Sequence, residues 1–141
     1  MNTIINPDQI LDDFINKIRQ SLKLFITTKV QMDGFYSLVL LARDNDSDIN
    51  SKYTLMISSK VLDKQNESST ITNLFEFLKK NMSNKFFRKI SKIYLFKTED
   101  KIVKAVNSAL NVTNGKVFLN NSSVNGITFI DSVVLESQKP V

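Results

Sequence analysis

The first hydrophobic pattern in the chain is that of an amphipathic helix. Apolar side chains recur at spacings of three and four from Ile10 to Phe25, which places them on one face of an α-helix. Asn6 is a preferred capping residue and Pro7 suits the first turn, so we predict that the helix starts there. We expect the apolar stripe to face the core; a helix that binds a partner is the alternative.

Two strands and a second helix are predicted next. Residues 35–42 form an apolar run of strand length, and residues 52–58 alternate in the manner of a strand. A polar, turn-rich stretch separates the two, which indicates a β-hairpin with a long tip. Ser69 or Thr70 is suited to cap the following helix, whose apolar pattern breaks at residues 83–84.

The second half of the chain continues this alternation. Residues 90–96 include an unbroken apolar stretch, which we interpret as a central strand that is buried on both faces. A third helix is expected to start at residues 98–100, where acidic residues favour a helix N-terminus. A short strand over 116–119 and, after a turn, a longer strand over 127–136 complete the pattern, with a bulge at Asp131.

The order α-β-β-α-β-α-β-β predicts an α/β fold, with a mixed α+β arrangement as the alternative. We expect residues 1–141 to form a single globular domain with a mixed sheet of about five strands and helices packed on it. The two strand–helix–strand units favour two parallel crossover connections. Residues 137–141 are expected to be a frayed tail.

The composition removes several classes of chemistry. The 141 residues include no Cys and no His, which excludes a Ser-His-Asp triad, a thiol nucleophile, a disulfide and zinc sites built on thiolate or imidazole. The segment from Asp44 to Asp48 resembles the start of a calcium loop, but Ile49 stands where the turn needs Gly and Leu55 where the bidentate Glu belongs. No Gly-rich phosphate loop is present either. We therefore predict no metal site, no cofactor and no catalytic residue.

The chain also lacks the patterns of membrane insertion and export. No stretch approaches the roughly 18 apolar residues of a membrane span, and the N-terminus has neither the basic nor the apolar region of a signal peptide. Together with the absence of Cys, this favours a cytoplasmic protein with no membrane partner.

Positive charge is concentrated in one segment. The net charge is +5, and residues 79–104 alone carry nine basic and two acidic residues. Such a segment, next to Phe86 and Phe87, indicates a surface for nucleic acid or another polyanion. The alternatives are a solvated Lys-rich face and the codon bias of an AT-rich genome, which favours Lys. Because only 3 of the 19 basic residues are Arg, such binding would be electrostatic and independent of sequence. The residues of this candidate surface are Lys79, Lys80, Lys85, Arg88, Lys89, Lys92, Lys101 and Lys104.

A second candidate site lies where two predicted strands end. Ser58, Ser59 and Lys60 follow one strand, and Lys97 and Thr98 follow the other. If the strands are parallel neighbours, these polar groups converge at one edge of the sheet, where α/β proteins bind ligands. Ordinary capping of strand and helix ends is the alternative explanation.

The sequence thus ranks three functions. The first is a small non-catalytic domain that binds a protein partner or assembles with itself, because few catalytic side chains and no cofactor motif are present. The second is a nucleic-acid-associated protein that uses residues 79–104. The third is a metal-dependent hydrolase that relies on carboxylates.

Overall fold

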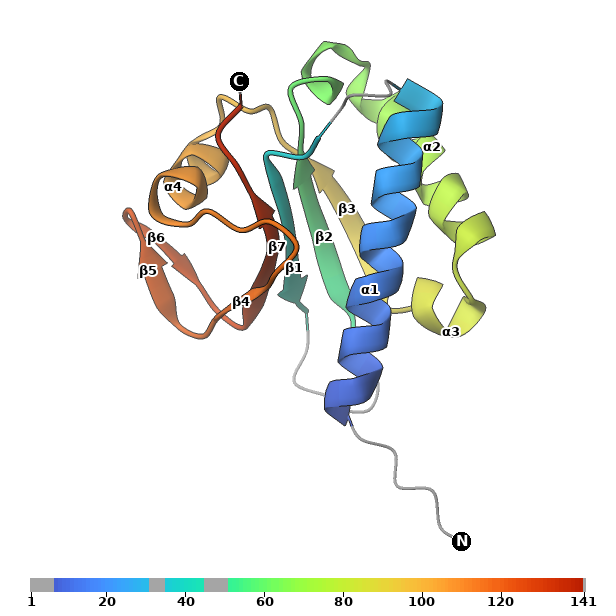
Figure 1. Cartoon of the computed structure of the whole chain (residues 1–141), viewed down its shortest axis with the longest axis horizontal. Coiled ribbons are helices and arrows are strands. Elements are labelled where there is room, and N and C mark those ends of the chain that lie inside the picture. The colour runs from blue at the N-terminus through green and yellow to red at the C-terminus, as the bar shows by residue number, and fades with distance from the viewer. Residues whose placement is uncertain (1–6, 31–34, 45–50, 141) are drawn as a thin grey trace, which may run out of the picture.

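A five-stranded mixed sheet forms the centre of the molecule (Figure 1) in the computed structural model, which describes residues 7–30, 35–44 and 51–140. The helices are α1 (Pro7–Phe25), α2 (Glu67–Asn81), α3 (Asn84–Phe87) and α4 (Lys101–Ala109), with a π-helical turn η1 (Ile26–Val30) after α1 and a 3-10 turn η2 (Leu62–Lys64). The strands are β1 (Leu38–Arg43), β2 (Tyr53–Ser58), β3 (Ile90–Leu95), β4 (Val117–Leu119), β5 (Ser122–Val124), β6 (Ile127–Phe129) and β7 (Ser132–Ser137). This mixed α+β fold in a single domain confirms the predicted architecture.

The order of strands confirms one parallel crossover and corrects the other. The sheet runs β3-β2-β1-β7-β4, and the only parallel pair among the described strands is β2 with β3. The connection through α2 and α3 is therefore the predicted crossover. The prediction for the next unit is wrong, because α4 carries the chain to the far edge of the sheet, where β4 pairs antiparallel with β7.

The apolar strand near residue 93 lies at the edge of the sheet and not at its centre. One face of β3 packs on the core through Ile90 and Ile93, but Lys92 is exposed and Tyr94 is 46% exposed on the other. The central strand is β1, whose Leu38 and Leu41 are both fully buried. A run of apolar residues cannot distinguish these positions, because burial depends on which helix covers the second face.

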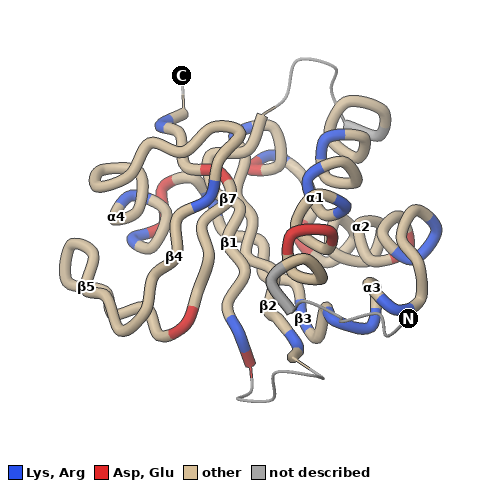
Figure 2. Tube along the Cα trace, turned by 60° about the horizontal axis from the view of Figure 1, so that its bottom comes forward, with Lys and Arg blue, Asp and Glu red and all other residues tan. Residues whose placement is uncertain are grey.

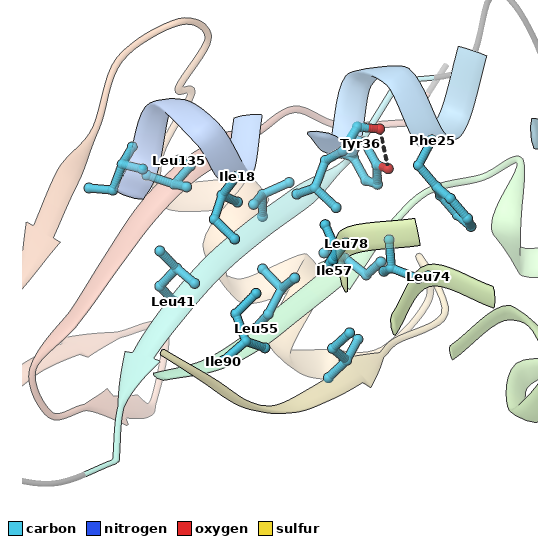
Figure 3. Packing of buried hydrophobic residues seen from close by; sticks show 14 of the residues in the cluster. Ile18, Phe25, Tyr36, Leu41, Leu55, Ile57, Leu74, Leu78, Ile90 and Leu135 are labelled. Atoms are coloured by element: carbon cyan, nitrogen blue, oxygen red, sulfur yellow. Dashed lines mark hydrogen bonds between the residues drawn. The ribbon is translucent and has the colours of Figure 1, made fainter. Parts of the chain in front are cut away.

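The two faces of the sheet have separate hydrophobic cores. On one face α1 and α2 pack over the sheet, and Figure 3 shows Ile18 of α1 facing Leu41 and Leu55. Phe14 and Ile18 are both 0% exposed, so the apolar stripe of the predicted first helix does face the core. On the other face α4 and the β5–β6 hairpin cover β1 and β7.

The predicted strand over 127–136 is interrupted at Asp131. This residue adopts a positive φ of 43°, and β6 ends before it while β7 begins after it. Instead of a bulge, the chain makes a corner that separates the β5–β6 hairpin from the main sheet. Asn125 and Gly126, with φ values of 48° and 84°, form the turn of that hairpin, which is the combination that two-residue hairpin loops favour. The segment predicted to be only a turn therefore contains β5.

The helix starts are set by short polar side chains. Asn66, not Ser69 or Thr70, caps α2, because its side chain accepts a hydrogen bond from the Ser69 amide at 2.9 Å. Ser83 caps α3 at the predicted break, and Asp100 caps α4. The predicted cap of α1 at residue 6 lies outside the described residues, as does most of the calcium-like segment at 45–50.

The last strand extends into the segment that we predict to be a frayed tail. Ser137 is fully buried, and its backbone exchanges two hydrogen bonds with Val112. The Gln138 amide donates to the Ser37 carbonyl at 3.1 Å. These contacts hold the first two residues of the segment against the body of the domain.

The burial of Tyr36 leads us to expect a change in the free energy of unfolding at high pH. The Tyr36 hydroxyl donates to the Leu22 carbonyl at 2.7 Å (Figure 3), and burial raises the pKa of Tyr36 well above its usual range. The unfolded chain loses this proton near pH 10, while the folded chain keeps it. The contribution of Tyr36 to the free energy of unfolding is therefore fully present below about pH 10 and decreases above it by about 1.4 kcal/mol per pH unit.

We expect Tyr36→Phe to remove this part of the pH dependence and to cost about 1 kcal/mol at neutral pH through the lost hydrogen bond. Urea unfolding of both proteins between pH 8 and 11, a range that brackets the ordinary tyrosine pKa of about 10, measures both effects. Parallel pH profiles of the free energy of unfolding would contradict the assignment.

Candidate functional site

The predicted strand-end residues do come together. Because β2 and β3 are parallel and Ile57 pairs with Leu95, both strands finish at the same edge of the sheet. Ser58 and Ser59 are fully buried there, and Thr98 is 5% exposed. The topological expectation that placed these residues side by side is thus met by the geometry.

Their polar atoms mostly bond to the chain itself. The Asp63 carboxylate of η2 accepts from the Thr98 amide at 3.0 Å and from the Thr98 hydroxyl at 2.5 Å, while the Lys97 ammonium donates to the Asp63 carbonyl at 2.5 Å. The Ser59 hydroxyl donates to the Phe35 carbonyl at 2.6 Å. Lys60 is exposed at the surface. This arrangement ties η2 to the end of β3, which is a structural role that the sequence pattern did not reveal.

The basic segment divides into two parts on different sides of the molecule. Lys101 and Lys104 belong to α4, on the face of the sheet opposite α1 and α2, and Lys104 forms an ion pair with Glu99 at 2.8 Å. Figure 2 shows positive positions around α3 and the start of β3, away from those on α4. We define the basic surface as the residues at the end of α2, on α3, between α3 and β3, and in β3, namely Lys79, Lys80, Lys85, Arg88, Lys89 and Lys92.

The basic surface has no carboxylate partner among the residues that the structure describes. The ion pairs among the described residues join Arg43 to Asp131 at 3.0 Å, Lys104 to Glu99, and Lys116 to Asp12. None of them includes a member of the basic surface. Cations without intramolecular partners raise the local potential and attract anionic partners.

The two phenylalanines next to these cations belong to the core. Phe86 packs against Phe14 with ring centroids 5.9 Å apart, and Phe87 packs edge-on against Phe75 at 5.5 Å. Both rings are partly buried. Because part of each ring is covered by this packing, less aromatic surface is left for stacking on bases.

An exposed apolar edge was not foreseen from the sequence. Phe118 of β4 is 51% exposed and Ile130, before β7, is 70% exposed. Among the exposed large apolar residues of the described chain, only these two exceed one half. Their pattern in the sequence is that of ordinary strand residues, so only the position of β4 at the edge of the sheet reveals their exposure.

A cavity of about 240 Å³ lies between α1 and the ends of β1 and β7. Its walls include Arg19 and Lys23 of α1, Tyr36 before β1, and Glu136 of β7. Sequence reasoning missed it, because residues more than a hundred positions apart line it and no local motif marks them.

No group of three or more His, Cys, Asp or Glu side chains within the described residues is placed to hold a metal ion. No helix within the described ranges has both the length and the apolar character needed to cross a bilayer. Comparison of the chain with protein-family models, with curated proteins and with solved structures finds no match.

Proposed function

We propose that this protein is a small non-catalytic binding domain whose partner is another protein chain, a second copy of itself included. The observation that carries the proposal is the exposure of Phe118 on the edge strand β4 and of Ile130 just before the neighbouring strand β7. We further propose that it acts in the cytoplasm, which the absence of Cys favours.

The two residues lie near the same end of the β4–β7 pair. Leu119 of β4 pairs with Ser132 of β7. Phe118 is one residue from this pair, and Ile130 is two residues from it. Single exposed apolar residues are common on protein surfaces, but neighbouring ones mark contact sites more often.

The edge itself offers a backbone contact. β4 is a terminal strand and is paired along one side only, with β7. A terminal strand presents unpaired amide and carbonyl groups to which another chain can add a strand, and exposed side chains beside it provide specificity. An open strand edge with exposed apolar side chains therefore favours a protein partner over an anionic polymer.

The test replaces both apolar side chains and asks whether association changes. We expect sedimentation velocity of the parent protein at rising concentration to reveal self-association if the partner is a second copy, and Phe118→Ser with Ile130→Ser to abolish it. The matched control is Leu24→Ser, because Leu24 is 47% exposed but lies near the C-terminal end of α1 and not on β4 or next to β7.

If the partner is a different protein and not a second copy, crosslinking in the cell tests the contact. A photoreactive amino acid at position 118 should then crosslink to one specific protein, and the same group at position 24 should not. A protein that stays monomeric at all concentrations and gives the same crosslinks from both positions contradicts the proposal.

The basic surface supports a second candidate function, association with nucleic acid. Its six cations lack intramolecular carboxylate partners within the described residues. Against it stand the scarcity of Arg and the packing of Phe86 and Phe87 in the core. We expect affinity for mixed-sequence DNA or RNA at physiological salt to be weaker than about 10⁻⁶ M.

The variant for this test changes Lys79, Lys80, Lys85 and Lys89 to Gln, and the control changes Lys101 and Lys104 to Gln on α4. Binding through the basic surface would show a logarithmic salt slope that falls by about 0.9 for each lost phosphate contact on duplex DNA. Tight, salt-sensitive binding that only the quadruple variant loses would place nucleic acid first.

A further inference from the structure

The cavity between α1 and the ends of β1 and β7 combines apolar walls with unusual polar groups. Its volume of about 240 Å³ is formed in part by Leu22, Ile26 and Val39, and Phe35 and Tyr36 add aromatic surface. Leu22, Ile26 and Val39 are nearly fully buried, so this wall belongs to the hydrophobic core. A pocket with apolar walls and a few convergent polar groups is the usual form of a small-molecule site.

Arg19 is the feature that distinguishes this cavity. Its Nε–H is buried and has no hydrogen-bond acceptor, and its Nη2 reaches only the Leu135 carbonyl, at 3.5 Å. No ion pair within the described ranges includes Arg19, although Glu136 lines the same cavity. Arg19 is half-buried, and a buried Nε–H without an acceptor is costly to the fold, so an anion that supplies the acceptor would bind favourably.

The charges around the cavity favour an anion with one acidic group. Arg19 and Lys23 are one helical turn apart on α1, and among the described residues that line the cavity Glu136 supplies the single acidic side chain. The guanidinium takes carboxylates in a planar, two-point contact that Lys cannot reproduce. The cavity is smaller than the roughly 300–1,000 Å³ that drug-sized ligands occupy, which restricts the ligand to a short body.

We propose that this cavity binds a small carboxylate with a short apolar body, whose carboxylate contacts Arg19. The apolar body lies against Leu22, Ile26 and Val39. Glu136 is the position at which an ammonium group would be recognised; one of its oxygens already accepts from the Gln138 side chain at 3.0 Å. A simple branched carboxylic acid and an apolar α-amino acid share this chemistry. The inference goes beyond the proposed protein contact at the β4 edge.

The experiment uses three probes of the same body: 4-methylpentanoate, its uncharged amide 4-methylpentanamide, and leucine. Isothermal titration calorimetry on the full chain should detect binding of at least one of the two carboxylates. The amide should bind at least about tenfold more weakly, because it cannot form the charge-assisted contact with Arg19. The ring resonances of Phe35 and Tyr36 should shift in the NMR spectrum as the carboxylate is added.

The variant Arg19→Gln should lower the affinity for the carboxylate by about tenfold or more. Arg88→Gln, the same substitution on the basic surface, should leave it unchanged. If circular dichroism shows that Arg19→Gln fails to fold, Lys23→Gln replaces it, because Lys23 is exposed and lines the same cavity. That variant should also weaken binding, and its failure to do so would count against the site.

Each further outcome decides the proposal. Leucine binding more tightly than the acid identifies an amino-acid site with Glu136 on the ammonium, and the reverse identifies a simple carboxylate site. Equal affinity for the acid and the amide overturns the proposal, as does the absence of binding by both carboxylates. The Phe118→Ser, Ile130→Ser protein should bind the carboxylate as the parent does, so this site and the protein contact fail or succeed independently.

Discussion

Replacing Phe14 by alanine is expected to lower the free energy of unfolding by about 3–5 kcal/mol, the range for a buried aromatic side chain. Phe14 is 0% exposed, and its ring lies 5.6 Å from that of Tyr53 and 5.9 Å from that of Phe86. It therefore connects α1 to both β2 and α3. Removing the ring leaves a cavity where three elements meet, and the backbone of a helix and a strand cannot collapse into it without losing other contacts.

The comparison for this prediction is Gln20→Ala on the same helix. Gln20 is exposed, and Gln and Ala both favour helices, so we expect a change within about 0.5 kcal/mol. Urea unfolding of the three proteins measures the difference. A Phe14→Ala protein with the midpoint of the parent would show that α1 is held to the sheet by other residues.

The second large effect is expected at the contact between η2 and the end of β3. In Asp63→Ala the amide and the hydroxyl of Thr98 both lose their acceptor, and Thr98 is 5% exposed. An unsatisfied buried donor costs about 1–3 kcal/mol, so two together predict a loss of about 2–6 kcal/mol.

Two further variants separate this contact from a general effect of charge. Asp13→Ala removes an exposed carboxylate from α1 and should change stability by less than about 0.5 kcal/mol. Thr98→Val keeps the shape of the side chain and removes the hydroxyl, so adding Asp63→Ala to it should cost less than adding it to the parent. Equal costs in the two backgrounds would mean that Asp63 and Thr98 do not act together.

Local patterns in the sequence correctly predicted most elements of this fold. The three- and four-residue spacing of apolar side chains identified α1 and its buried face, because a helix repeats about every 3.6 residues whatever surrounds it. The break at Ser83 is also visible in the sequence, because a short polar side chain can accept hydrogen bonds from the free amides at the start of the next helix. The convergence of Ser59 and Thr98 follows from a parallel crossover, which can be predicted because its strand, helix and next strand are consecutive in the sequence.

Two predictions that require the position of a strand within the sheet are wrong. The apolar run that contains Ile93 is predicted at the centre but lies at the edge, and β4 is predicted to continue the parallel order but pairs antiparallel with β7. The order of strands depends on pairing between segments that are far apart in the chain, so no single segment determines it. The sequence near Ile93 contains no information about which helix covers its second face.

The surfaces that carry the proposals depend on tertiary structure more strongly still. The sequence alone established that positive charge is concentrated in residues 79–104 and that the chain has no Cys or His. Only the fold separates Lys101 from the basic surface and exposes Phe118. Only the fold brings Arg19 and Glu136 to one cavity across 117 positions of the chain. A charge or an apolar side chain is encoded locally, but its solvent exposure and its partners are determined by which elements pack against it.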